Sequence, residues 1–304
     1  MLRHETIVVT GATGQVGFPV AVALAADNEV IAPARFSDPA QRARLEAAGV
    51  RCVVADLGAG QLDEVPTEPT YVLHFAVSKT NDWDADIRNN AEGVGLLMAH
   101  CKAAKAFLHC STTGVYHDDG TGGPFSEESA LGDNHRVSPF LQTYSITKVA
   151  AEAAARLSAR LWNLPTTIAR LNVPYGDNGG WPAIMLDLAQ MGFPTEVPAG
   201  GPAVYNPIHE DDIVALVPKL LEIAAVPAVT VNLAGEEVVS VQEWTAFLKE
   251  LTGVEIPLVE SPSAIPSVTC DLTKQHALVG KAEISWRDGM RRMIEVRHPE
   301  LLSK

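Results

Sequence analysis

The fold is decided by the stretch Thr6-Ile7-Val8-Val9-Thr10-Gly11-Ala12-Thr13-Gly14-Gln15-Val16-Gly17. An apolar, β-branched run ends at Thr10, and three glycines follow at a spacing of three before an apolar helical pattern begins. This order predicts a strand, a tight turn and a helix whose N-terminus can bind an anion. Gly11 allows the chain to reverse, Gly14 lets backbone N–H groups approach a diphosphate, and Gly17 lets the helix pack on the strand. A glycine-rich turn without a ligand is the alternative, but the flanking strand and helix favour a dinucleotide.

The rest of the first half alternates short apolar segments with helical patterns. We expect strands at 5–10, 29–33, 50–55, 71–76, 106–110 and 166–171 and helices at 15–26, 39–48, 85–104 and 142–161. Alternation of this kind predicts an α/β fold, namely a doubly wound parallel sheet of the Rossmann type covered by helices on both faces. Ligands of such sheets bind at the carboxyl ends of the strands.

The pattern changes after Pro174, where glycine and proline become frequent. Further helices are predicted at 183–191, 210–224, 241–252 and 286–297, with a strand at 229–233 that returns to the main sheet and a strand-like segment at 268–271. We therefore predict a dinucleotide-binding domain at 1–174, to which 207–235 returns. Segments 175–206 and 236–304 are expected to form a smaller C-terminal lobe that binds substrate.

Composition narrows the class of protein. The 304 residues are 47% hydrophobic and carry a net charge of −14, which argues against nucleic-acid and anionic-membrane partners. No apolar run has the length of a membrane span or a signal peptide, so we expect a cytoplasmic protein. The four cysteines are far apart and are expected to be reduced. His117, Asp118 and Asp119 are interpreted as a solvated turn, and no metal is expected.

Two stretches carry candidate catalytic groups. In Tyr144-Ser145-Ile146-Thr147-Lys148, the tyrosine and the lysine lie on one face of a helix. An ammonium group beside a phenol lowers the pKa of the phenol, which can then exchange a proton with an alcohol or carbonyl oxygen. Ser111 and Thr112 place hydroxyls at the end of a predicted strand, where they could polarise a substrate oxygen. The alternatives are a solvated tyrosine and lysine, and a Ser/Thr turn without a catalytic role.

Together these motifs resemble a known family, the extended (atypical) short-chain dehydrogenases/reductases, also called the NAD-dependent epimerase/dehydratase family. The resemblance covers nearly the whole chain. Besides the glycine turn and the Tyr–Lys motif, it rests on Asp56-Leu57, His74-Phe75-Ala76, Asn90-Ala91-Glu92-Gly93, Ser111-Thr112-Thr113-Gly114-Val115-Tyr116, Ala169-Arg170-Leu171-Asn172-Val173-Pro174-Tyr175-Gly176 and Asn206-Pro207-Ile208-His209-Glu210-Asp211-Asp212-Ile213.

The resemblance implies roles for individual residues. Tyr144 is the expected acid/base, Lys148 its pKa partner and a ribose ligand, and Thr112 the catalytic hydroxyl, with Ser111 as the fallback. The expected cofactor-binding residues are Gly11, Thr13, Gly14, Gln15, Val16, Gly17, Arg35, Asp56, Leu57, Phe75, Ala76, Val77, Asn90, Ser111, Tyr144, Lys148, Asn172 and Val173. The resemblance also implies a homodimer through the helices 85–104 and 142–161.

The end of the second strand bears on the choice of cofactor. NAD-preferring members place an acidic side chain there, where it binds the ribose 2′-hydroxyl. In this chain the position is Ala34, and Arg35 follows it. A guanidinium group would pair with a 2′-phosphate, so the sequence favours NADP over NAD. The alternative is that Arg35 is a solvated loop cation.

Three departures bear on the reaction. Tyr205 stands where members acting on nucleotide sugars have an arginine, Thr113-Gly114 stands where dehydratases have an Asp-Glu pair, and His117 replaces a glycine. The main hypothesis is therefore an NADP-dependent oxidoreductase that transfers hydride between the nicotinamide and a carbonyl or secondary alcohol of a small neutral substrate. The alternatives are a nucleotide-sugar epimerase or dehydratase with tightly bound NAD(P), and a non-catalytic NADP-binding sensor.

Overall fold

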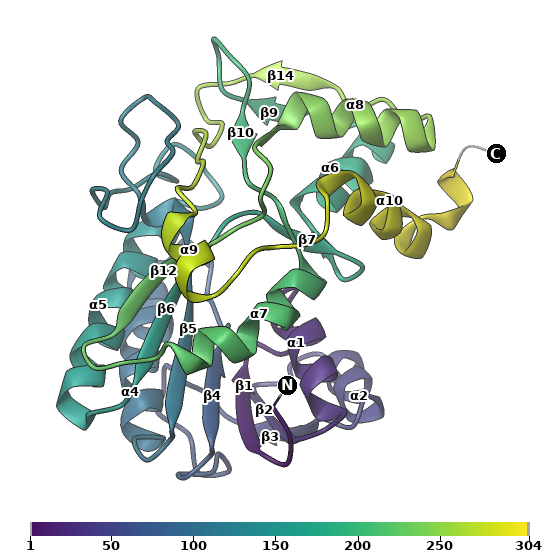
Figure 1. Ribbon diagram of the computed structural model, residues 1–304. Helices are drawn as coiled ribbons and strands as arrows, with labels where there is room; N and C mark the ends of the chain where they lie inside the picture. Colours follow the sequence, from purple (N-terminus) through teal and green to yellow (C-terminus); the bar gives the residue numbers. More distant parts are fainter. Residues whose placement is uncertain (1, 303–304) are drawn as a thin grey trace. The chain divides into compact units, whose positions relative to one another are not determined.

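A seven-stranded β-sheet forms from the alternating elements of the first half of the chain (Figure 1). The computed structural model describes residues 2–302. The strand order is β12-β6-β5-β4-β1-β2-β3. The strands are β1 Thr6–Thr10, β2 Glu29–Ala34, β3 Arg51–Val54, β4 Tyr71–His74, β5 Ala106–Thr112, β6 Thr166–Leu171 and β12 Val229–Leu233. Because β1 pairs in parallel with both β2 and β4, the chain winds outward in two directions from β1, which confirms the predicted doubly wound sheet.

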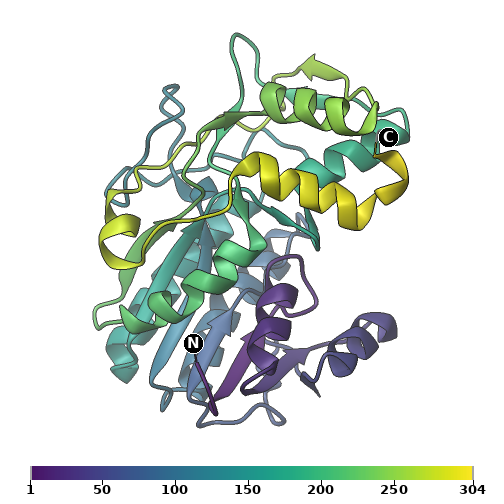
Figure 2. The same ribbon diagram turned by 45° about the vertical axis from the view of Figure 1, so that its right-hand side comes forward.

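Helices cover both faces of this sheet. They are α1 Gly17–Ala25, α2 Pro39–Ala47, α4 Gly93–His100, α5 Tyr144–Trp162 and α7 Glu210–Glu222. Figures 1 and 2 show α1 and α7 on one face and α4 and α5 on the other. On the α4/α5 face, strand residues such as Val72 and Phe107 pack against Leu97 of α4 and Ala155 of α5. Each large apolar side chain buried there contributes about 1.5–3 kcal/mol.

The segment 85–104 is not the single continuous helix that the sequence predicts. The structure has α3 Trp83–Ile87, a π-helical turn at Arg88–Glu92 and then α4. The Asp82 side chain caps α3 by accepting a hydrogen bond from the Ala85 backbone N–H, so the helix begins earlier than expected. Its first residue is Trp83. The π-turn coincides with Asn90, whose buried side chain bonds to residues outside the helix.

Other boundaries differ by a few residues. Strand β5 continues to Thr112 instead of ending at Cys110, so both candidate hydroxyls lie in the strand. The segment 268–271 forms only isolated bridges, through Val268 and Cys270, and is not a regular strand. Helix α9, Thr273–Leu278, was not predicted.

The chain divides into two compact units. The first holds the residues up to Thr112, Thr143–Arg170 and Val214–Val231, and the second holds Thr113–Gln142, Leu171–Ile213 and the chain from Asn232 onward. This division differs from the predicted domains mainly in segment 113–142, which groups with the second unit. Strand β12 joins the edge of the main sheet, as expected from the sequence. That the second unit binds substrate stays a prediction.

The second unit has its own core around Trp244, Tyr116 and Tyr175. Three helices and several two- or three-residue strands surround this core. They are α6 Trp181–Gln190, α8 Val241–Thr252, α10 Trp286–Arg297, β7 Pro174–Gly176, β8 Gly179–Gly180, β9 Thr195–Val197, β10 Val204–Tyr205, β11 Ile208–His209, β13 Val239–Ser240 and β14 Leu258–Glu260. Helix α8 begins with a capping box, in which Ser240 and Glu243 each accept a hydrogen bond from the backbone of the other.

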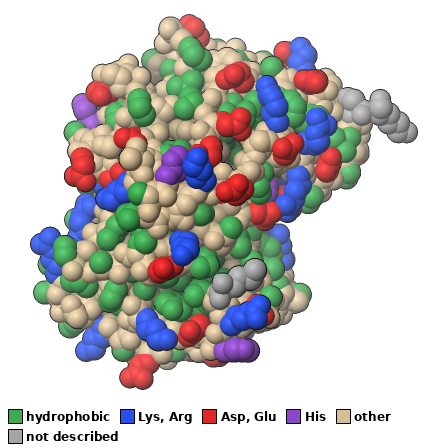
Figure 3. Space-filling model, in the orientation of Figure 1, with side chains coloured by type: hydrophobic (Ala, Val, Ile, Leu, Met, Phe, Trp, Pro, Cys, Tyr) green, Lys and Arg blue, Asp and Glu red, His purple; other side chains and the backbone are tan. Residues whose placement is uncertain are grey.

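The surface carries both signs of charge. On the face shown in Figure 3, lysine and arginine side chains stand among aspartate and glutamate side chains. Among residues 2–302, no helix combines the length and the apolarity that a bilayer span requires. Within the same range, no group of three or more His, Cys, Asp or Glu side chains could hold a metal ion.

Candidate active site

The glycine turn after β1 has the geometry that its sequence predicts. Gly11 has φ +69°, and a Cβ there would lie 2.5 Å from the backbone nitrogen of Ala76. A Cβ on Gly17 would lie 2.3 Å from the carbonyl oxygen of Gly11. These two glycines are therefore required by the packing of the turn itself. Val16, the N-cap of α1, supplies no side-chain acceptor, so α1 offers backbone N–H groups to an anion.

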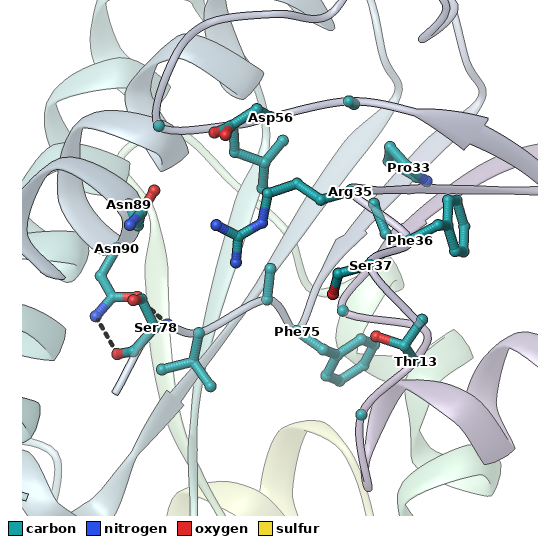
Figure 4. Close-up of a pocket in the computed structure, with 18 of the residues that line it drawn as sticks. Thr13, Pro33, Arg35, Phe36, Ser37, Asp56, Phe75, Ser78, Asn89 and Asn90 are labelled. Carbon is teal, nitrogen blue, oxygen red and sulfur yellow. Dashed lines mark hydrogen bonds between the residues drawn. The ribbon is translucent and has the colours of Figure 1, made fainter. Parts of the chain in front are cut away.

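A pocket of about 260 Å³ opens beside this turn, at the carboxyl ends of β1, β2, β3 and β4 (Figure 4). Its lining brings together many of the predicted cofactor residues from distant parts of the sequence. They are Gly11, Thr13, Gly14, Arg35, Asp56, Leu57, Phe75, Ala76, Val77 and Asn90. In Figure 4 the Arg35 side chain extends into the pocket toward Asn89. The donor set and the glycine cradle fit a dinucleotide.

Sequence reasoning missed part of this lining. Pro33, Phe36, Ser37, Gln41, Ala55, Gly58, Ser78 and Asn89 also face the pocket. Ser37 and Gln41 could have been found by following the chain from Arg35 into the first turn of α2. Asn89, in the π-helical turn Arg88–Glu92, carried no such signal. Gln15, Val16 and Gly17 do not line the pocket, and their cofactor contacts stay predictions.

The two candidate hydroxyls at the end of β5 have different partners. The Ser111 hydroxyl donates to Glu152 Oε1 at 2.7 Å, inside a buried cluster with Arg170. The Thr112 side chain is instead hydrogen-bonded to the Tyr144 phenol. Both hydroxyls contact α5, Thr112 at Tyr144 in its first turn and Ser111 at Glu152 two turns further along. This arrangement favours Thr112 over Ser111 as the catalytic hydroxyl.

The ionisation of Tyr144 differs from what its spacing to Lys148 predicted. Burial raises the pKa of Tyr144 to about 12, while the hydrogen bond from Thr112 opposes this rise. Lys148 is buried, and its ammonium group donates to the Cys110 carbonyl oxygen at 2.7 Å rather than to the phenol. Burial also lowers the pKa of Lys148. In this arrangement a backbone carbonyl holds the ammonium group, and the lowering of the phenol pKa by Lys148 stays a prediction.

A second cation lies close to the tyrosine. The Lys79 ammonium group, from the loop after β4, is 4.8 Å from the centre of the Tyr144 ring. Lys79 had no assigned role, and nothing in its sequence context identified it. The residues Tyr144, Thr112 and Lys148 all belong to the first unit, so the predicted catalytic set is assembled within one body.

Two histidines on adjacent strands lie in the same sheet. His74 of β4 and His109 of β5 are buried and stacked with ring centroids 5.3 Å apart. Burial lowers the pKa of His74 to about 3 and that of His109 well below its ordinary value. Both rings are therefore neutral near pH 7 and are unsuited to carrying a proton to substrate.

Asn172 and Val173 belong to the second unit. The Asn172 amide group donates to Thr113 Oγ1 and to the Val268 carbonyl oxygen, and its own oxygen accepts from the Asn206 backbone. This buried side chain therefore ties three segments of the second unit together. The predicted contacts of Asn172 and Val173 with the cofactor stay predictions.

Comparisons with known proteins agree with this architecture. The model of the NAD dependent epimerase/dehydratase family matches residues 7–234. None of the curated proteins matches the chain. Among solved structures, MoeE5 in complex with UDP-glucose and NAD has a TM-score of 0.80 at 23% identity, covering 97% of this chain and 99% of that one.

Two further solved structures show the same fold. UDP-glucose 4-epimerase from Thermotoga maritima, with UDP-glucose, has a TM-score of 0.81 at 21% identity, covering 97% of this chain and 99% of that chain. UDP-N-acetylglucosamine 4-epimerase from Methanobrevibacter ruminantium M1, in complex with UDP-N-acetylmuramic acid, has a TM-score of 0.83 at 16% identity, covering 98% of this chain and all of the other.

The sheet, the glycine turn and the pocket define a dinucleotide-binding fold, which the chain shares with solved structures such as that of MoeE5 with NAD. The chain belongs to the NAD-dependent epimerase/dehydratase family, since the family model covers about three quarters of its length.

Proposed function

We propose that the protein catalyses hydride transfer between a nicotinamide cofactor and a substrate carbon that bears a hydroxyl or carbonyl group. The observation that carries the proposal is the hydrogen-bonded pair of Thr112 and Tyr144 at the carboxyl end of β5. Two adjacent hydroxyls can bind one substrate oxygen, with Thr112 orienting it and Tyr144 exchanging its proton. When bound, the nicotinamide ring supplies or accepts the hydride.

The protonation of Tyr144 suits reduction. With a pKa of about 12, the phenol carries its proton near neutral pH and can donate it to a carbonyl oxygen. In the direction of oxidation, the phenol must first lose its proton. Lys148 lies one helical turn further along α5 and could stabilise that phenolate if its ammonium group left the Cys110 carbonyl oxygen.

Two net reactions share this step. In the first, an oxidoreductase consumes the cofactor with each turnover. Tyr205 favours the oxidoreductase, because it stands where members acting on nucleotide sugars have an arginine. This buried side chain donates to the carbonyl oxygens of Ile265 and Pro266. In the second, an epimerase or dehydratase first oxidises a nucleotide sugar with NAD(P)+ and then returns the hydride to the sugar, so the cofactor is reduced and reoxidised within one turnover. Solved structures of similar fold favour the second, since MoeE5 holds UDP-glucose and NAD and the Thermotoga maritima epimerase holds UDP-glucose.

Absorbance of the reduced nicotinamide separates the two reactions. The protein is mixed with NADPH or NADH and a panel of aldehydes, ketones and UDP-sugars, and sugar products are separated by chromatography. Loss of reduced-cofactor absorbance in proportion to product supports the oxidoreductase. Conversion of a UDP-sugar with no net change in absorbance supports the epimerase or dehydratase. If neither reaction occurs and the cofactor still binds, hydride transfer is rejected in favour of a cofactor-binding sensor.

We further propose that the cofactor is NADP. Arg35 lines the pocket together with Ser37 and Gln41, and Ala34 supplies no carboxylate at the end of β2. A charge-assisted bond between a guanidinium group and a 2′-phosphate is stronger than a neutral hydrogen bond. The same cation gains much less from the 2′-hydroxyl of NAD.

Replacing Arg35 with alanine is expected to weaken NADPH binding about ten- to hundredfold, which is the value of one lost charge-assisted hydrogen bond. NADH binding should change less than about twofold in the same variant. Fluorescence titration of each reduced cofactor measures both constants. Arg51→Ala removes an exposed cation of β3 outside the pocket lining and serves as the control. Equal losses of affinity for NADPH and NADH in Arg35→Ala would show that Arg35 does not bind the 2′-phosphate.

A further inference from the structure

A buried carboxylate joins the loop after β4 to the start of α5. Asp86, in α3, is fully buried. Its Oδ1 accepts hydrogen bonds from Ser78 Oγ at 2.6 Å and from Thr80 Oγ1 at 2.9 Å. Its Oδ2 accepts from the backbone N–H groups of Thr80 at 3.0 Å and Asn81 at 3.1 Å. The same oxygen accepts from Thr143 Oγ1 at 2.7 Å.

Asn90, four residues further along, makes a second connection between the same two segments. Its Oδ1 accepts from the Ser78 backbone N–H at 2.6 Å, and its Nδ2 donates to the Ser78 carbonyl oxygen at 2.9 Å. The same Nδ2 donates to Thr147 Oγ1 at 3.0 Å. Asp86 and Asn90 therefore bind Thr143 and Thr147, which are also four residues apart.

These two connections act next to the proposed catalytic groups. Thr143 directly precedes Tyr144, and Thr147 directly precedes Lys148. Asp86 and Asn90 also bind the loop after β4, which contains Ser78 and Lys79. Ser78 lines the cofactor pocket, and the Lys79 ammonium group lies over the Tyr144 ring. A shift of α5 relative to this loop would move the phenol away from its place beside Thr112.

We infer that Asp86 is a positioning residue, which holds the N-terminus of α5 and the loop 78–81 in one fixed arrangement and thereby sets the place of Tyr144 relative to the cofactor pocket. The inference rests on the proposed function, in which Tyr144 exchanges the proton. Asp86 does not touch the reacting atoms. Its effect on turnover passes through Thr143 on one side and through the loop on the other.

The carboxylate is better suited to this place than an amide. All the groups around Asp86 are donors, and an ionised carboxylate is an acceptor at both oxygens. Burial by itself would raise the pKa of Asp86, but the hydrogen bonds from Ser78 and Thr143 hold that pKa below its ordinary value. In one orientation an asparagine would turn its NH2 group toward the backbone N–H groups of Thr80 and Asn81, which cannot accept; in the other the hydroxyls of Ser78 and Thr80 would have to accept instead of donate.

Three variants and one control test the inference. Thr143→Val removes the hydrogen bond between Asp86 and α5, and Thr143→Ser keeps the hydroxyl that makes it. Asp86→Asn disturbs the hydrogen bonds of residue 86 both to α5 and to the loop 78–81. Asp84→Asn changes an exposed acid of the same helix and is the matched control. The NADPH dissociation constant is measured by fluorescence, and kcat and KM are measured on the best substrate of the panel. Amide hydrogen exchange of segments 78–81 and 143–147 is measured without any substrate.

We expect Thr143→Val to lower kcat about ten- to hundredfold, since small displacements of a catalytic group have effects of this size. Its NADPH dissociation constant and KM should stay within about twofold of the unmodified protein, and Thr143→Ser should restore kcat. Asp86→Asn should speed exchange in both segments together and also weaken NADPH binding. Asp84→Asn should change none of these quantities. A general loss of stability would not separate kcat from cofactor binding in this way.

Other outcomes contradict the inference. If Asp86→Asn leaves exchange unchanged in either segment, the carboxylate does not couple the two segments. If Thr143→Val keeps the kcat of the unmodified protein while Tyr144→Phe loses it, Tyr144 is catalytic but is not positioned through Thr143. If Tyr144→Phe itself retains full turnover, the proposed chemistry fails instead, and hydrogen exchange still decides whether Asp86 couples the segments.

Discussion

Replacing Tyr144 with phenylalanine is expected to lower turnover about a thousandfold, within the range that a positioned general acid or base contributes. The variant loses only the hydroxyl that is hydrogen-bonded to Thr112. NADPH affinity should change less than about twofold, because Tyr144 does not line the pocket beside the glycine turn. Initial rates on the best substrate of the panel and fluorescence titration of NADPH measure the two quantities.

The control for this experiment is Tyr71→Phe, which removes a hydroxyl at the first residue of β4, at the opposite end of that strand from His74. It should retain turnover.

The pH dependence of the reaction gives an independent check on Tyr144. Because the pKa of Tyr144 is raised to about 12, reduction should keep its rate up to alkaline pH and fall only as the phenol ionises, whereas oxidation should accelerate with rising pH. Retention of more than about a tenth of the activity in Tyr144→Phe would exclude Tyr144 as the main proton donor.

Replacing Glu152 with alanine is expected to lower the free energy of unfolding by about 3–5 kcal/mol, the loss observed when one partner of a buried ion pair is removed. Glu152 is fully buried in α5 and accepts from Arg170 Nε at 2.9 Å and Nη2 at 2.8 Å. It also accepts from Ser111 and from Arg156 Nη1. The variant would leave the buried Arg170 guanidinium group without its anion. Urea unfolding followed by circular dichroism measures the change.

An exposed ion pair provides the comparison for Glu152. Glu222 pairs with Lys219 at 2.7 Å on the surface of α7, where water screens both charges. Glu222→Ala should therefore shift the unfolding curve far less than Glu152→Ala. Similar shifts for the two variants would mean that the buried cluster adds no more to stability than a surface pair.

Several regular elements of both units could be predicted from local sequence patterns. Strand β6, strand β12 and helices α8 and α10 have the predicted bounds, because β-branched runs and amphipathic spacing specify such elements locally. The glycine turn was predictable for the same reason, since Gly11 needs φ > 0 and Gly17 leaves no room for a Cβ. The family also followed from the order of these motifs along the chain, and the match to residues 7–234 confirms it.

The errors arose where a side chain bonds to a residue far away in the chain. The π-turn at Arg88–Glu92 has no local signal, and it forms around Asn90, which bonds to Ser78 and Thr147. The hydrogen bond of Lys148 to a backbone carbonyl was not predictable for a similar reason. Spacing along α5 places it near Tyr144, but it does not show the Cys110 carbonyl oxygen on the adjacent strand.

The sequence by itself determined the class of fold and the family, because these depend on residue type and on order along the chain. Only the tertiary structure showed the partners of the two candidate hydroxyls, since Ser111 bonds to Glu152 and Thr112 to Tyr144. It also placed Asp86 against Thr143 and the Lys79 ammonium group over the Tyr144 ring. Hydrogen bonds and burial in a folded chain depend on which distant segments meet, and no local pattern of residues contains that information.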